Sequence, residues 1–141
     1  MRTTAVLAAI ALLLAGSTYA QNAAQQAAPE PPPLCGEDEE ATTVRIDIDS
    51  EAKTVYPKEC VVAPGTTVVW WEDGDAMFES SFTGGTPDSR GAKKFKSTRV
   101  GGHHEAKFKA KNVNARASFN YDVTINGETL DPTVIVDPNG R

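Results

Sequence analysis

The alternation of apolar and polar residues constrains the fold of this chain more than any other feature. One six-residue stretch alternates without a break: Val44, Arg45, Ile46, Asp47, Ile48 and Asp49. A period of two predicts a β-strand with one buried face. Residues 117–125 alternate in the same way, and residues 66–71 are all β-branched or aromatic, which also favours a strand. Beyond residue 20, no segment sustains the 3.6-residue apolar spacing of a helix.

Turn signals separate these stretches. Pro64-Gly65, Gly101-Gly102 and Asn126-Gly127 each combine residues that suit tight turns, and Asn-Gly is a strong hairpin signal. Seven or eight short strands with turns between them predict an all-β domain built as a two-sheet sandwich. We expect this domain to cover residues 42–138.

The first twenty residues have the pattern of a secretion signal. Arg2 precedes an apolar run at residues 5–15, and small residues end at Ala20. The alternative is a membrane anchor, but eleven apolar residues fall short of the roughly 20 that span a bilayer. Residues 21–41 are rich in Ala, Gln, Pro and acidic residues, which predicts a flexible tether. We therefore expect a periplasmic or secreted protein with no membrane span after cleavage of residues 1–20.

Cys35 and Cys60 are the two cysteines of the chain. Outside the cytoplasm a lone pair usually forms a disulfide. The alternative is a pair of metal-binding thiolates, which neither a Cys-x-x-Cys spacing nor a nearby histidine supports. We predict the disulfide.

Charge is segregated along the sequence. Without Arg2 the chain has 13 basic and 19 acidic residues, a balance that argues against general nucleic-acid binding. Residues 30–79 carry a net charge of −10, whereas residues 90–116 carry +8. Alternation predicts that two lysine sets point outward, one opposite Phe95 and one opposite Phe108: Lys94 and Lys96, then Lys107, Lys109 and Lys111. These lysines are candidates for binding an acidic protein or an anionic polysaccharide. Alternatively, they form a solvated face that prevents aggregation at sheet edges, or they neutralise the acidic half of the chain.

Trp70 and Trp71 are adjacent, so one is expected to point into the sandwich and the other out of it. An outward Trp71, beside Glu72 and Asp73, is a candidate for stacking on a sugar or a peptide. It could equally lie beneath the segment that carries Cys35.

Three segments resemble the cupredoxin family, the plastocyanin-like copper proteins: Val61-Val62-Ala63-Pro64-Gly65-Thr66-Thr67-Val68-Val69-Trp70, Ala117-Ser118-Phe119-Asn120-Tyr121 and Asp131-Pro132-Thr133-Val134-Ile135-Val136. The resemblance implies a Greek-key sandwich of cupredoxin type. It also places the family's copper ligands near Phe78 or Met77, at Tyr121 and at Thr124. A type 1 copper centre needs two imidazoles and a thiolate, which these residues do not supply. We therefore expect a divergent member without blue-copper electron transfer and without a cofactor.

Two functions remain as hypotheses. The first is an exported, non-catalytic binding module for a protein or anionic glycan of the cell envelope. Motifs for a nucleophile elbow or a phosphate-binding loop are absent from the sequence, so we expect no enzyme activity. The alternative is a periplasmic copper-binding protein that uses Met77, His103 and His104. Because adjacent residues on a strand point to opposite faces, the two histidines could chelate together only from a turn.

Overall fold

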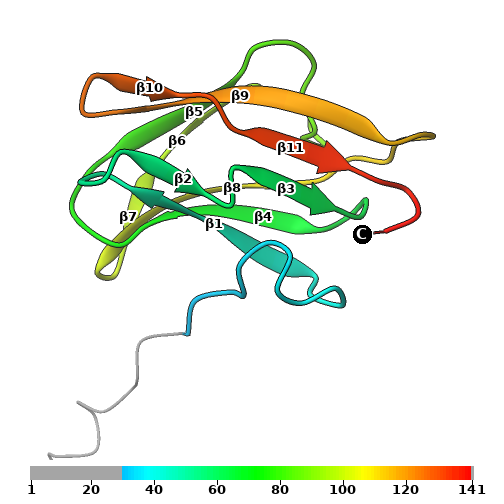
Figure 1. The fold of residues 1–141 in the computed structure, drawn as a ribbon, viewed down its shortest axis with the longest axis horizontal. Coiled ribbons are helices and arrows are strands. Elements are labelled where there is room, and N and C mark those ends of the chain that lie inside the picture. The colour runs from blue at the N-terminus through cyan, green and yellow to red at the C-terminus, as the bar shows by residue number, and fades with distance from the viewer. Residues whose placement is uncertain (1–29, 141) are drawn as a thin grey trace, which may run out of the picture.

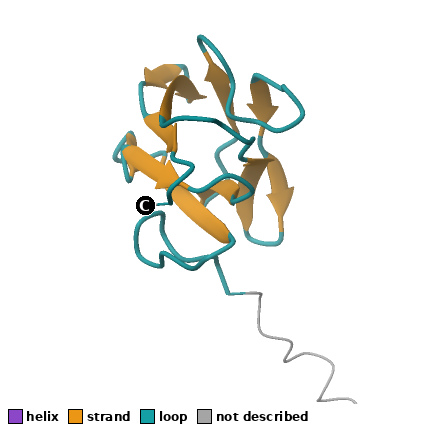
Figure 2. Cartoon of the chain, turned by 90° about the vertical axis from the view of Figure 1, so that its right-hand side faces the viewer, coloured by secondary structure: helices purple, strands orange, loops and turns teal. Residues whose placement is uncertain are grey.

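Two β-sheets stacked face to face form the domain in the computed structural model, which describes residues 30–140 (Figure 1). The strands are β1 Thr43–Asp49, β2 Thr54–Tyr56, β3 Glu59–Val62, β4 Thr67–Glu72, β5 Phe78–Phe82, β6 Lys94–Lys96, β7 Thr98–Val100, β8 His103–Lys109, β9 Ala117–Ile125, β10 Glu128–Leu130 and β11 Thr133–Val136. The described residues contain no helix, and Figure 2 shows strands joined by loops alone. The all-β, two-sheet sandwich is confirmed.

One sheet has five strands in the order β2-β1-β4-β8-β7, and the other has six, in the order β3-β11-β9-β5-β6 with β10 beside β9. Most neighbours are antiparallel, but β1 runs parallel to β4 and β3 runs parallel to β11. These two pairs join strands that are distant in sequence, so the chain must cross between the sheets several times.

The core forms where the inner faces of the sheets meet. Trp70, from the five-stranded sheet, is fully buried at its centre. The Trp70 ring centroid lies between 5.1 and 6.0 Å from those of four other aromatic side chains. These are Phe82, Phe95, Phe108 and Tyr121. Since Phe108 belongs to the same sheet as Trp70 and the other three to the six-stranded sheet, this cluster holds the two layers together.

The predicted turns are present. Gly65 adopts a φ of 86°, a conformation that L side chains rarely adopt. Asn126 and Gly127 have φ values of 50° and 78°, as a two-residue hairpin turn between β9 and β10 requires.

The prediction of seven or eight strands was too low. Residues 93–100 include two short strands, β6 and β7, which belong to different sheets because the chain crosses between them at Ser97. A short strand, β10, follows the Asn126-Gly127 turn. Moreover, β8 begins at His103, so both histidines lie in a strand and not in a turn.

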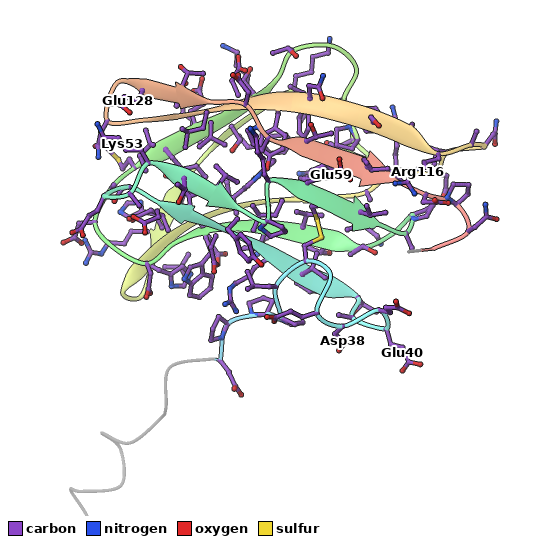
Figure 3. The ribbon with its side chains drawn as sticks, viewed as in Figure 1. Asp38, Glu40, Lys53, Glu59, Arg116 and Glu128 are labelled. Carbon is purple, nitrogen blue, oxygen red and sulfur yellow. A yellow bond between two sulfur atoms is a disulfide. The ribbon has the colours of Figure 1, made fainter. Side chains whose placement is uncertain are left out.

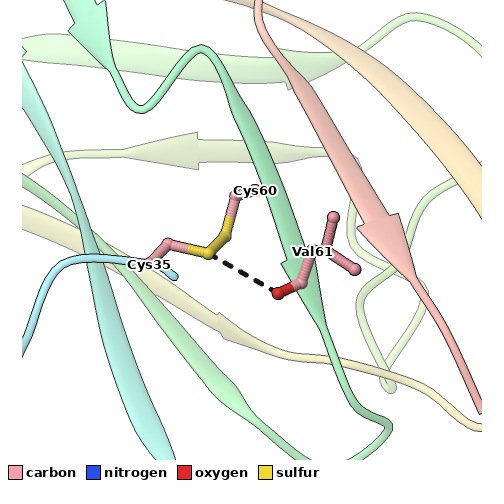
Figure 4. Close-up of a disulfide and its surroundings, with 3 residues drawn as sticks. All are labelled: Cys35, Cys60 and Val61. Atoms are coloured by element: carbon pink, nitrogen blue, oxygen red, sulfur yellow. Dashed lines mark hydrogen bonds between the residues drawn. A yellow bond between two sulfur atoms is a disulfide. The ribbon is translucent and has the colours of Figure 1, made fainter. Parts of the chain in front are cut away.

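The predicted disulfide between Cys35 and Cys60 is present, with Cα atoms 5.7 Å apart (Figure 4). It joins the N-terminal segment, which lies along β1, to β3 of the other sheet. Around this bond, Arg45 N–H donates to Pro33 O at 2.8 Å and Cys35 N–H donates to Arg45 O at 2.9 Å.

This pairing corrects the predicted boundary of the tether. Its described end, from Pro33 onward, is hydrogen-bonded to the sheet, so the ordered domain begins before residue 42. In Figure 3, Asp38 and Glu40 lie on the loop that leads from this segment into β1. The rest of the predicted tether up to residue 29, and the predicted signal, lie outside the described residues.

Two ion pairs connect distant parts of the chain. Lys53, in the turn between β1 and β2, pairs with Glu128 of β10 (Figure 3). Arg116, before β9, pairs with Asp137, after β11, at 3.0 Å. Across residues 30–140, no helical segment has the length and apolar character needed to cross a bilayer.

Candidate partner-binding face

The outer face of the five-stranded sheet gathers the side chains of greatest functional interest. Cross-strand neighbours point to the same side of a sheet, so the register defines rows across it. One row contains Arg45 of β1, Val69 of β4 and Lys107 of β8. The next row contains Tyr56, Asp47, Trp71, Glu105 and Thr98, from all five strands. We call this surface the sheet-1 face.

Trp71 lies at the middle of the sheet-1 face. Trp70 points into the core, so its neighbour must point outward. The Trp71 ring stacks on the His103 ring, with centroids 3.4 Å apart and planes 13° apart. His103 Nε2 lies 3.1 Å from a carboxylate oxygen of Glu105. This histidine, rather than the Cys35 segment, is therefore the aromatic support against which Trp71 is held.

Two further apolar side chains are exposed on the same face. Tyr56 on β2 is 65% exposed and pairs in register with Asp47. Val100 on β7 is 41% exposed and pairs with His103. Tyr56 lies in the same row as the half-buried Trp71, with Asp47 between them, and Val100 lies one row further along, beside His103. Exposed aromatic residues that are grouped, rather than scattered, are typical of interaction surfaces.

An acidic groove of about 560 Å³ borders Trp71 at one end of this face. The groove is lined by Asp47, Ile48, Asp49, Ser50, Glu51, Trp71, Glu72, Asp73, Gly74 and Asp75. Glu72 is buried, and its carboxylate accepts hydrogen bonds from Ser50 Oγ at 2.8 Å and from the backbone N–H groups of Gly74 and Ala76 at 3.0 and 3.2 Å. These bonds fix the loop after β4, because one carboxylate satisfies donors from both sides of the groove.

The five candidate lysines do not form a single surface. Lys107 and Lys109 are exposed on the sheet-1 face, and Lys107 Nζ lies 3.6 Å from Glu105. Lys111 follows the end of β8, and its Nζ lies 5.0 Å from the centroid of the Phe119 ring, in a cation–π contact. Lys94 and Lys96 are exposed on β6 of the six-stranded sheet. The two lysine sets therefore face outward from different sheets.

The structure does not bring the alternative metal ligands together. Since β8 includes both histidines, His103 points outward and His104 points toward the interior, opposite Glu72. Met77 is 72% exposed in the loop between β4 and β5. His104 Nδ1 is buried and has no hydrogen-bond partner. Within residues 30–140, no group of three or more His, Cys, Asp or Glu side chains is arranged to hold a metal ion.

The positions implied by the cupredoxin resemblance do not fit a copper ion. Phe78 is buried and offers no lone pair, and Thr124 points away from the core. Tyr121 is buried against Trp70, and loss of hydration raises the pKa of its phenol. A neutral phenol deep in an aromatic cluster is a poor replacement for the thiolate of a type 1 centre.

Sequence reasoning missed Tyr56, Val100 and Glu105 as members of this face. The short strands that carry the first two show no alternation long enough to assign a side, and the position of Glu105 depends on where β8 begins. No protein-family model matches the chain, and a search of curated proteins finds no match.

Proposed function

We propose that the chain is an exported, non-catalytic binding module that presents the sheet-1 face to an anionic partner in the cell envelope. The partner would be an acidic protein or an anionic polysaccharide. The observation that carries this proposal is that Tyr56, Trp71, Val100, Lys107 and Lys109 all lie on one side of one sheet, with Lys107 in the row next to that of Trp71. Trp and Tyr are enriched at binding hot spots, and neighbouring cationic side chains attract an anionic partner.

Export to the periplasm or beyond is part of the proposal. The signal-like pattern of residues 1–20 supports it, and so does a disulfide, which persists in oxidising compartments. The cupredoxin-like motifs, together with the two-sheet architecture, support a scaffold of that type whose role is to hold the face rigid.

The division of the lysines between two sheets provides a matched test. A Lys107→Gln/Lys109→Gln variant and a Lys94→Gln/Lys96→Gln variant lose the same charge from different faces. We expect the first to elute from an anionic matrix at lower salt than the second, because its lysines lie on the same face as Trp71, with Lys107 in the adjacent row. A Trp71→Ala variant should also elute earlier if the aromatic side chain takes part.

Equal shifts from the two lysine variants, with no effect of Trp71→Ala, would show that retention depends on net charge alone and would contradict the proposal. A pull-down from envelope extract, with the Lys107→Gln/Lys109→Gln variant as control, would then identify the partner.

A further inference from the structure

Charge on the sheet-1 face changes sign along the strands. The row of Arg45, Val69 and Lys107 is basic, and Lys109 extends it toward one end. The adjacent row carries the carboxylates of Asp47 and Glu105 on either side of Trp71. Beyond that row lies the acidic groove. The face is thus divided into a basic half and an acidic half, with its largest aromatic side chain close to the boundary.

A surface divided in this way is complementary to itself. A two-fold axis in the plane of contact can run across the strands, between these two rows. Rotation about this axis places the basic half of one copy over the acidic half of the other. Arg45 then lies opposite the second copy's Asp47, and Lys107 lies opposite the second copy's Glu105. At the centre, the second copy's Trp71 lies opposite the position of Val69, whose side chain is already buried within the single chain. Such a contact is isologous, so both halves are satisfied at once and the assembly closes as a dimer.

We propose that the anionic partner of the sheet-1 face is the acidic half of a second copy of this chain, and that the two copies form a face-to-face dimer. This inference rests on the proposed function, because it names the partner of the same face. Tyr56, exposed in the single chain at the β2 edge of the sheet, would be covered in the dimer, whereas Val100 would lie at its rim, because β7 pairs only with residues 103–105 of β8.

The size of the face sets the expected affinity. Its longest strands, β1 and β8, have seven residues each. With about 3.3 Å per residue and about 4.8 Å between strands, five strands offer a face of roughly 23 by 20 Å. Two copies would bury roughly 900 Å², which is below the usual range for stable complexes. In addition, Arg45 and Lys107 already contact Asp47 and Glu105 within one chain, at 2.7 and 3.6 Å. The dimer should therefore be weak and sensitive to salt.

Charge reversal tests the proposal with two complementary variants. The basic half is reversed in Arg45→Glu/Lys107→Glu, and the acidic half in Asp47→Lys/Glu105→Lys, which are the residues that lie opposite one another in the dimer. The control Lys94→Glu/Lys96→Glu makes the same charge change on the other sheet. Sedimentation of the purified chain would be followed at concentrations up to about 1 mM, at low and high salt.

We expect the unaltered chain and the control to dimerise, and the dissociation constant of each face variant alone to rise by about tenfold or more. An equimolar mixture of the two face variants should regain the affinity, because reversed charges then meet reversed charges. A mixture that stays monomeric, or an unaltered chain that stays monomeric throughout, would overturn the dimer. If the chain is monomeric yet still needs Lys107 and Lys109 for retention on an anionic matrix, the further inference fails while the proposed function stands.

Discussion

A pair of carboxylates on β9 and after β10 makes stability depend on pH. Asp122 points outward from the six-stranded sheet, and Asp131 lies close to it. Partial loss of hydration, followed by the hydrogen bond to Asp131 and the repulsion from its charge, raises the pKa of Asp122. A raised pKa means that the folded chain binds this proton more tightly than the unfolded chain does. The contribution to the free energy of unfolding is therefore present at low pH and is lost as pH rises through the pKa of Asp122.

Replacing Asp131 with Asn should remove this repulsion. At neutral pH we expect Asp131→Asn to raise the free energy of unfolding by about half a kcal/mol or less, since exposed charges are well screened. In acid, where Asp122 is protonated, the gain should disappear. Urea denaturation at both pH values would measure it, with the exposed Glu39→Gln as a control for loss of one negative charge. An equal gain at both pH values would exclude the repulsion as its source.

Single residues also show where sequence reasoning stops. Alternation predicts that one of Trp70 and Trp71 points inward, but the choice depends on the register of β4 with its neighbours. In the structure Ile46 and Ala106 flank Trp70 on the inner side. The contact between Asp122 and Asp131, in contrast, follows from the Asn126-Gly127 hairpin signal, because a two-residue turn fixes the register of β10 with β9.

At the scale of elements, long alternating stretches are predictable and short ones are not. The nine-residue β9 has a pattern strong enough to give both its existence and its buried side. In contrast, β6 and β7 have three residues each, too few for a period to be measured. Their separation at Ser97 depends on which sheet each joins, and that is a tertiary effect. The extension of β8 to His103 is similar, because its pairing with β7 draws the histidines into the strand.

The disulfide is an element-scale constraint on the N-terminal segment. It fixes Cys35, which lies beside β1, to Cys60 in β3, with a sequence separation of 25. A loop of this length, when cross-linked, stabilises a fold by about 3 kcal/mol through the lost freedom of the unfolded chain. We expect the Cys35→Ser/Cys60→Ser variant to lose about that much in guanidinium denaturation, while keeping its far-ultraviolet circular dichroism.

Hydrogen exchange would show where the disulfide acts. Hydrogen bonds of the backbone amides at positions 35 and 45 join the segment to β1. In the same variant, the protons of these two amides should exchange faster than those of the β9 amides. Unchanged protection at these two amides would mean that the backbone pairing holds the segment without help from the sulfur atoms.

For the whole molecule, the sequence predicts the sandwich but not the arrangement of its charges. The two lysine sets are only eleven residues apart between Lys96 and Lys107, yet the crossing after β6 places them on different sheets. No local pattern carries that information. Likewise, residues from five separate strands meet on the sheet-1 face, so the arrangement of its aromatic side chains and charged halves depends on the strand order.

The aromatic cluster should make the two sheets unfold as one unit. Phe108 contacts Trp70 at 5.1 Å, Phe82 at 5.7 Å and Phe95 at 5.9 Å between ring centroids, so it packs against both layers. Phe108→Leu keeps an apolar side chain but leaves part of the ring volume empty. We expect it to lower the free energy of unfolding by about 1–2 kcal/mol. Val100→Ala, at an exposed site, should change it by about 0.5 kcal/mol or less.

Two spectroscopic probes distinguish unfolding of both sheets together from unfolding of one sheet before the other. Tryptophan fluorescence reports on β4, which carries both Trp70 and Trp71, while far-ultraviolet circular dichroism reports on the strands of both sheets. If one core holds the layers together, the two denaturation curves of Phe108→Leu should coincide and should shift together from those of the unaltered chain. Curves that separate would mean that the six-stranded sheet keeps its structure after β4 has been lost. The rings shared between the sheets would then contribute less to stability than the contacts within each sheet.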